Sequence, residues 1–169
     1  MVHSIELLFD RDTEAAIGRI WDDLAVADIL GRAPAGRPHV TVAVAERIAP
    51  DVDALLRPVA QRLPLGCTVG APLLFGRSNA VLARLVVPTA ELLALHAEVH
   101  RICGQYLDPG PLPNSLPGQW TAHVTVARGV GGPQLERAFH LAGQPSEIHG
   151  TVAGLRRWDG TNRVEHPIS

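Results

Sequence analysis

The pentapeptide HVTVA at residues 39–43 decides the fold of this chain, because the same five letters return at residues 123–127, 84 positions later. Both copies are rich in β-branched residues and are expected to be strands. Successive side chains of a strand point to opposite faces, so His39 and Thr41 should share one face, with the valines up to Val44 on the other. Each copy therefore offers an imidazole and a hydroxyl on one side.

The flanking sequence alternates between strand and helix patterns in both halves of the chain. Strands are expected at residues 2–9, 39–46, 65–75, 79–88, 147–158 and 164–168, and around the second pentapeptide. Helices are expected from Thr13 to about Leu30, capped by Asp12 or Thr13; over 51–63, kinked or shortened by Pro58; from Ala90 to about Tyr106, capped by Thr89; and at 133–142. Loops or turns are expected at 31–38, 76–79 and 159–162 and, with four prolines, at 107–119. This order predicts a duplicated α+β lobe, with the two lobes facing each other.

Composition limits the class of protein. Hydrophobic residues at 46% and charged residues at 19% of 169 predict one packed domain, or two small lobes sharing a core. No apolar run approaches the roughly 20 residues of a membrane helix, and the start lacks a signal-peptide pattern, so a cytoplasmic protein without membrane contact is expected. Cys67 and Cys103 form no CxxC pattern and are expected to be reduced, partly buried thiols.

The charge of the chain limits its ligands. A net charge of −2 and a pI near 6.4 argue against an extended nucleic-acid surface, since gripping many phosphates draws on a dense basic surface. A small anionic ligand or the end of an RNA is compatible with this balance.

The repeated histidines suit acid-base chemistry at phosphorus. Because the unperturbed pKa of histidine is near 6.5, one imidazole can be neutral and take a proton from the attacking oxygen. The other can be protonated and donate its proton to the leaving oxygen. The two threonine hydroxyls could donate hydrogen bonds to the non-bridging phosphate oxygens, and the arrangement requires no metal. A single His-x-Thr on a strand is weak evidence, because most such residues are partly buried polar groups; the repetition makes the pair informative.

The two H-x-T-x motifs, His39-Val-Thr41-Val and His123-Val-Thr125-Val, in opposite halves of a chain of this size resemble those of the two-histidine (2H) phosphoesterase superfamily. That superfamily includes 2'-5' RNA ligase-like proteins and cyclic nucleotide phosphodiesterases. Arg128, which follows the second motif, also resembles the family pattern. The resemblance covers nearly the whole chain.

The resemblance implies a bilobal α+β fold with pseudo-two-fold symmetry, in which antiparallel sheets with flanking helices surround a central cleft. One domain would span residues 1–169, with lobes of about 1–80 and 81–169; an exchange of terminal strands between them is left open. The implied chemistry uses no metal or cofactor and acts on 2',3'-cyclic phosphates, 2'-5' linkages or ADP-ribose cyclic phosphate. His39 and His123 would form the acid-base pair, with Thr41 and Thr125 on the phosphate. Which histidine is the base stays open.

Four further residues are candidate substrate contacts. Aromatic residues make up only 4% of the chain, so Trp120, just before the second motif, and Tyr106, before the proline-rich loop, could stack on a base, although core packing is the commoner role. Arg37 and Arg128 adjoin the motifs and could contact a phosphate. Strand alternation puts Arg128 on the face opposite His123 unless the strand ends or bulges there.

The helical segment HAEVH, at residues 96–100, invites a metal interpretation, because histidines four apart share a helix face. In the zinc-protease pattern a glutamate directly follows the first histidine, whereas here Ala97 holds that place. A solvated helix face is therefore expected for His96 and His100.

Together these observations predict a monomeric, metal-independent phosphodiesterase that hydrolyses a cyclic phosphate or 2'-5' phosphodiester of a nucleotide or RNA terminus. Two alternatives remain open: a non-catalytic module that binds a nucleotide or RNA end, and a 2'-5' RNA ligase, which the acidic pI disfavours.

Overall fold

The computed structural model describes residues 1–29, 34, 36–76 and 80–169. Its strands are β1 (His3–Phe9), β2 (His39–Ala45), β3 (Arg47–Ile48), β4 (Leu65–Phe75), β5 (Ala80–Val86), β6 (Leu107–Asp108), β7 (His123–Val130), β8 (Ile148–Asp159) and β9 (Val164–Ile168). Its α-helices are α1 (Arg11–Val26), α2 (Val52–Leu55), α3 (Arg57–Ala60), α4 (Ala90–Cys103) and α5 (Leu135–Ala142).

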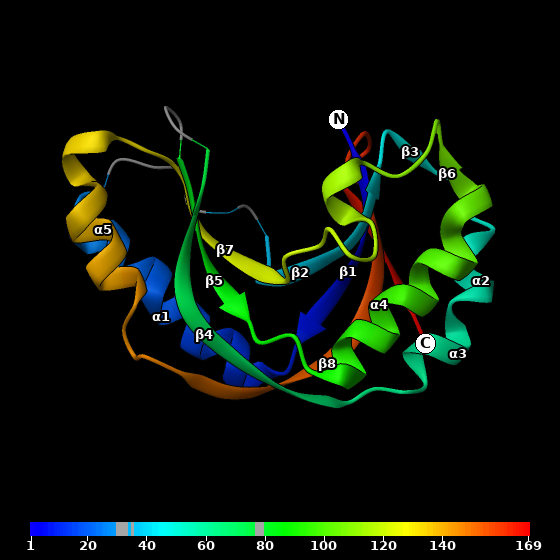
Figure 1. The fold of residues 1–169 in the computed structure, drawn as a ribbon, viewed down its shortest axis with the longest axis horizontal. Helices are drawn as coiled ribbons and strands as arrows, with labels where there is room; N and C mark the ends of the chain where they lie inside the picture. The colour runs from blue at the N-terminus through cyan, green and yellow to red at the C-terminus, as the bar shows by residue number, and fades with distance from the viewer. Residues whose placement is uncertain (30–33, 35, 77–79) are drawn as a thin grey trace.

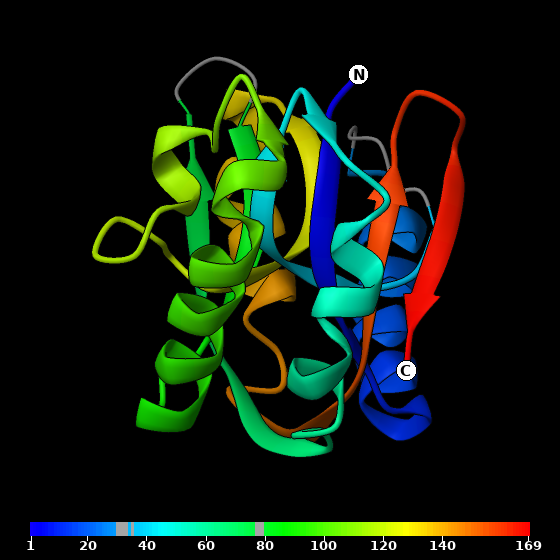
Figure 2. The same ribbon diagram turned by 90° about the vertical axis from the view of Figure 1, so that its right-hand side faces the viewer.

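One antiparallel sheet runs in the order β1-β2-β7-β5-β4-β8-β9 and curls back on itself, because β8 also pairs with β1 (Figure 1). The long strand β8 pairs first with β4 and then with β1, and β9 forms the outer edge beside it, red beside orange in Figure 2. The sheet thus has two wings: a first wing of β2, β1, the end of β8 and β9, and a second wing of β7, β5 and the end of β4.

The two wings draw strands from both halves of the sequence. The late strands β8 and β9 extend the wing that holds the first motif, whereas β4, from the first half, extends the wing that holds the second motif. The wings meet at the motif strands through one backbone pair, Val40 with Val124.

The helices are also exchanged between the halves. Helix α1 packs with α5 on the second wing, against β7 and β5, whereas α4, with α2 and α3, packs on the first wing against β2 (Figure 1). Each motif strand is therefore backed by a helix from the opposite half of the sequence. The valines Val40, Val42, Val124 and Val126 face these helices and are almost completely buried in one continuous apolar core.

Most predicted elements are confirmed, because their signals are local. Pro58 divides the predicted helix over 51–63 into α2 and α3, and the Thr89 hydroxyl caps α4 by accepting from the Leu92 amide at 3.2 Å.

The two cysteines are free thiols. Cys67 is half-buried and Cys103 is buried, and burial raises the pKa of Cys67 to about 11 and that of Cys103 to about 12.

Three details differ from prediction. The cap of α1 is Asp10, whose carboxylate accepts from the Thr13 amide at 2.9 Å, and neither Asp12 nor Thr13 takes that role. The helix ends at Val26, and the predicted end near Leu30, like parts of the predicted loop at 31–38 and turn at 76–79, lies outside the described residues. A small sheet of β3 and β6 was not predicted from the sequence. Within the described ranges, every helix is too short or too polar to cross a membrane.

Candidate active site

The register of the sheet brings the two motifs together. Because Val40 pairs with Val124 in antiparallel fashion, the residue on either side of each valine faces its counterpart: His39 lies opposite Thr125, and Thr41 lies opposite His123. The paired valines point into the core, so these four side chains point to the other face of the sheet. The predicted juxtaposition of both His-x-Thr motifs is therefore present.

Each motif ends in a β-bulge at the same place. Ile5 pairs with Ala43 and Glu6 with Thr41, which leaves Val42 as the extra residue of β2; β7 repeats this arrangement, with an extra residue at Val126. A bulge shifts the alternation of the strand by one residue. It turns Val44 toward the open face, where the sequence pattern had placed it on the core face.

The bulge in β7 does the same for Arg128, at the position that corresponds to Val44. Because of the extra residue at Val126, Arg128 faces the same side as His123 and Thr125 instead of the opposite side that strict alternation predicts. A second extra residue, Gly129 with φ of 73°, follows directly, since Val81 pairs with Arg128 and Ala80 with Val130. A guanidinium therefore joins the motif side chains from one strand only.

Both imidazoles are held in the same way. The Nδ1–H of His39 donates to the carbonyl of Arg37 at 2.8 Å, and the Nδ1–H of His123 donates to the carbonyl of Thr121 at 2.7 Å. A carbonyl only accepts, so the proton is on Nδ1, and Nε2 of each ring is the atom available for proton transfer. This anchoring two residues upstream fixes the tautomer of both histidines.

Two adjoining hollows cover the motif face. The one around His39 has a volume of about 450 Å³ and the one around His123 about 510 Å³, within the range of small-molecule sites. Thr41, Val44 and Arg128 line both, so the two hollows form one cleft that contains both motifs. The proline-rich segment supplies part of the wall on the His123 side, where Leu112 donates its amide to the Val44 carbonyl at 2.9 Å.

The surroundings of the two histidines differ. The ring of His123 lies 4.7 Å from that of Phe75, centroid to centroid, and burial, with Arg128 and His39 as further contributors, lowers its pKa. The Nε2 of His39 lies instead 3.6 Å from a carboxylate oxygen of Glu6, which is 3% exposed. The cleft is therefore chemically asymmetric although its motifs are identical.

Two tryptophans support the motif strands through hydrogen bonds to their backbone. The indole N–H of Trp120 donates to the Thr41 carbonyl at 2.9 Å, and that of Trp21, on α1, donates to the Thr125 carbonyl at 3.3 Å. Both acceptors adjoin the bulges, where strand pairing is interrupted. Trp120, a predicted substrate contact, also lines the cleft, but His96 stacks on its ring at 3.9 Å and 5°.

The expectation of a solvated face at His96 and His100 is wrong. The two residues are 2% and 9% exposed, and their Nε2 atoms hydrogen-bond to the carbonyls of Ser115 and Val42 at 2.8 and 3.0 Å. Burial lowers the pKa of both, that of His96 to about 4. These histidines therefore join α4 to the proline-rich segment and to the first motif strand.

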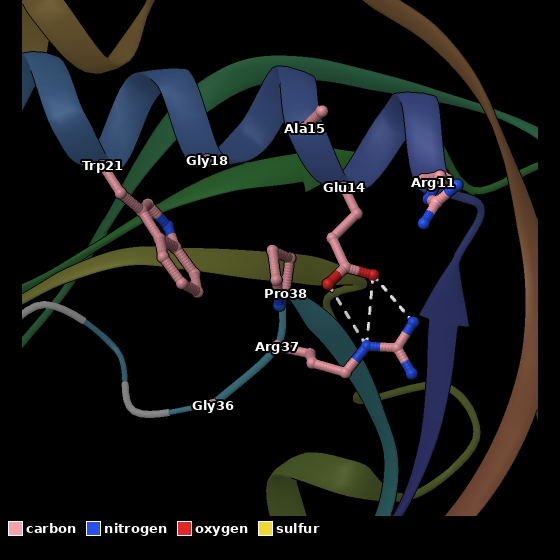
Figure 3. A pocket seen from close by; sticks show the side chains of 8 residues that line it. All are labelled: Arg11, Glu14, Ala15, Gly18, Trp21, Gly36, Arg37 and Pro38. Carbon is pink, nitrogen blue, oxygen red and sulfur yellow. Dashed lines mark hydrogen bonds and ion pairs between the residues drawn. The ribbon is translucent and has the colours of Figure 1, made fainter.

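The remaining predicted contacts lie apart from the cleft lining. Arg37 turns to α1, where its guanidinium pairs with the Glu14 carboxylate at 2.7 Å in a separate hollow that also contains Trp21 (Figure 3). Tyr106 follows α4 and packs against the core.

Sequence reasoning missed Glu6, Phe75 and Trp21 as contributors to the site. Glu6 carried a signal, since it is the one acidic residue within an otherwise largely apolar strand. Trp21 reads as a core residue of an amphipathic helix, and its bond to Thr125 depends on packing between elements 104 residues apart.

Comparison with known proteins gives a consistent result. A sequence profile described as the 2'-5' RNA ligase superfamily matches residues 9–162. No curated protein matches the chain. Similar solved structures include TT0787 of Thermus thermophilus, with TM-score 0.62 and 14% identity, covering 100% of this chain and 96% of the other.

Two further solved structures are described as holding a nucleotide. LigT of E. coli complexed with 3'-AMP gives a TM-score of 0.57 at 12% identity, covering 99% of this chain and 94% of the other. Usb1 of Kluyveromyces marxianus with uridine monophosphate gives a TM-score of 0.57 at 12% sequence identity, covering 99% of this chain and 97% of the other. At such identities the likeness shows a shared fold.

Proposed function

The chain belongs to the 2'-5' RNA ligase superfamily, the two-histidine phosphoesterases, and from this premise we propose that it is a metal-independent phosphodiesterase. Its substrate would be a cyclic phosphate or 2'-5' phosphodiester of a nucleotide or RNA end. The predicted family and the predicted α+β fold of that family are confirmed. The activity rests on one observation above all: two imidazoles with backbone-anchored Nδ1 face a single cleft from adjacent strands.

The proposed reaction divides the work between the two histidines. One neutral imidazole takes a proton from water through Nε2, and the water oxygen forms the new bond to phosphorus. The bond from phosphorus to the ribose oxygen breaks, and the second imidazole, protonated, gives its proton to that oxygen. The product is a phosphomonoester, and each histidine ends in the protonation state of the other.

The negative charge that develops on the phosphate oxygens has candidate partners in the cleft lining. The hydroxyls of Thr41 and Thr125 stand beside the opposite motif's histidine, and Arg128 offers a guanidinium suited to contact with two phosphate oxygens. A nucleotide-sized substrate agrees with the volume of the hollows and with the 3'-AMP and uridine monophosphate bound by the two similar structures.

The first prediction tests this function directly. Removal of either imidazole, in His39→Ala or His123→Ala, should lower kcat/KM on a 2',3'-cyclic nucleotide by a factor of about 10² to 10⁴, roughly 3 to 5 kcal/mol in the barrier. His140→Ala, which removes an exposed imidazole on α5, is the matched control and should leave the rate unchanged. Steady-state rates with and without EDTA make the measurement.

Three results would contradict the proposal. Loss of activity in EDTA would remove the metal-free mechanism. Tight calorimetric binding of a nucleotide phosphomonoester, with no turnover of any cyclic or 2'-5' substrate, would indicate a binding module instead. Joining of two RNA ends without net hydrolysis would indicate a ligase.

A further inference from the structure

The pseudo-symmetry of the sheet allows the two histidines to be compared position by position. On the first wing, the strand next to the motif places Glu6 opposite Thr41; on the second wing the same position opposite Thr125 is Ala83. One strand further out, Arg156 stands opposite Glu6, and Leu73 stands opposite Ala83. An ion pair beside His39 is therefore replaced by two apolar side chains beside His123.

The carboxylate of Glu6 is held firmly. Its Oε2 accepts from Nε of Arg156 at 2.8 Å and lies 2.7 Å from the second guanidinium nitrogen. Its Oε1 accepts from the Ser4 hydroxyl at 2.6 Å and is the oxygen that lies 3.6 Å from Nε2 of His39. Arg156 also pairs with Glu165 at 2.6 Å, so its positive charge is shared by two carboxylates.

The charges around each histidine can be compared completely within the described residues. Those that face His39 or adjoin it are on Glu6, Arg156, Glu165, Arg163, Arg128 and Arg37. Arg37 is neutralised by Glu14 (Figure 3), and Arg156 by its two carboxylates. Arg128 and Arg163 line the hollow without an ion-pair partner in the described ranges, and both are available to an anionic substrate.

Within the part of the chain that the structure describes, the one charged group in ion-pair range of the His39 ring is thus a carboxylate, which favours a positive charge beside it. His123 has the opposite environment. Among the described residues, the charges that act on it come from the Arg128 guanidinium, which is always positive, and from the His39 ring, which is positive when protonated; the Phe75 ring packs against the His123 ring at 4.7 Å between centroids. Cations and burial both disfavour a second imidazolium there.

We propose that Glu6 is a positioning residue that keeps His39 as the general acid, which leaves His123 as the general base. This inference rests on the proposed function and assigns the two roles that the repeated motif leaves equivalent. It fixes the direction of the reaction in the cleft: water is activated on the apolar side, beside Phe75, and the ribose oxygen leaves on the charged side, beside Glu6.

The test compares Glu6→Gln with Asp53→Asn. The second variant breaks a similar pair, Asp53 with Arg157 at 2.7 Å, outside the cleft lining. Glu6→Gln should lower kcat about tenfold at pH 7.5 with little change in KM, and the loss should be larger on the basic limb of the pH profile than on the acidic limb, because a neutral amide no longer balances a positive charge on the neighbouring ring. Asp53→Asn should change neither. An unchanged basic limb, or a loss that is uniform at all pH values, would overturn the assignment.

A second measurement needs no Glu6 variant to fold and no activity. In NMR titrations of the wild-type histidine Cε1–H signals, assigned with His39→Gln and His123→Gln, the His123 signal should titrate at lower pH than the His39 signal. Equal or reversed order would overturn the role of Glu6. If the wild type turned over no phosphodiester while the NMR order held, the proposed function would fail and the electrostatic asymmetry would stand.

Discussion

His96 is a base that the fold keeps neutral. Its side chain is stacked on Trp120 and buried, and burial, with His100 as a second contributor, lowers its pKa to about 4, against 6.5 for a free histidine. Between these two values the unfolded chain binds a proton at this residue that the folded chain does not. The contribution of the neutral His96 to the free energy of unfolding should therefore be fully present above about pH 6.5. It should be lost progressively as the pH falls toward 4.

The size of this loss can be measured. The shift corresponds to up to about 3 kcal/mol for His96 alone. Urea unfolding at pH 7.5, 5.5 and 4.5 should show that the free energy of unfolding falls more steeply with decreasing pH in the wild type than in His96→Gln. The glutamine amide can donate to the Ser115 carbonyl in place of the imidazole but does not titrate. His140→Ala, which removes an exposed histidine, should keep the wild-type slope. Parallel slopes for wild type and His96→Gln would refute the assignment.

At the scale of elements, the bulged motif strands depend on donors outside the sheet. A bulge leaves a residue without its strand partner, and the indole of Trp120 supplies a hydrogen bond to the Thr41 carbonyl beside it. The corresponding carbonyl of Thr125 receives the indole of Trp21. The two bulges are thus stabilised by the same type of side chain from unrelated positions.

Trp120→Phe isolates this hydrogen bond. It keeps an aromatic ring to stack on His96 but removes the donor, so it should cost about 1 kcal/mol in the free energy of unfolding. Trp21→Phe should cost a similar amount, and Trp120→Ala, which also empties the ring's volume, about 3 kcal/mol or more. Denaturant unfolding of the three variants makes the comparison. A Trp120→Phe variant as stable as the wild type, beside a costly Trp120→Ala, would show that packing, and not the donor, dominates.

At the scale of the whole molecule, Arg84 ties several elements together, and its partners among the described residues are all backbone carbonyls. It is fully buried in β5, and its guanidinium donates to the carbonyl of Gly70 in β4, to that of Ala142 at 2.8 Å, and to those of Pro145 and Ser146. The fork of five N–H donors matches this set of acceptors, which a compact ammonium cannot reach together.

Arg84→Lys should therefore destabilise the protein by about 3 kcal/mol, because buried carbonyls would lose their donors. Arg101→Lys is the control: Arg101 is exposed and pairs with Glu98 on α4, so its replacement should leave the unfolding free energy nearly unchanged. Equal effects of the two substitutions in thermal or urea unfolding would contradict this role of Arg84.

The strands, the helices and the pairing of the motifs could be predicted from sequence, because period-2 alternation, the Thr89 cap and the Pro58 break are local signals. The bulges could not, because they depend on the register between strands far apart in the chain, and so Val44 was placed on the wrong face. The burial of His96 could have been predicted, because this residue lies four positions after Leu92 and three before Val99, on the apolar face of α4.

The exchange of helices between the wings has a consequence for genetics. Trp21 on α1 supports the strand of His123, and His100 on α4 supports the strand of His39. A mutation in a helix of one half of the sequence should therefore disturb the motif strand of the other half. Suppressor mutations should follow the same crossed pattern, with changes near the amino terminus compensating lesions around the second motif. The two halves should therefore tolerate large changes only together, because a helix from each half supports the motif strand of the other.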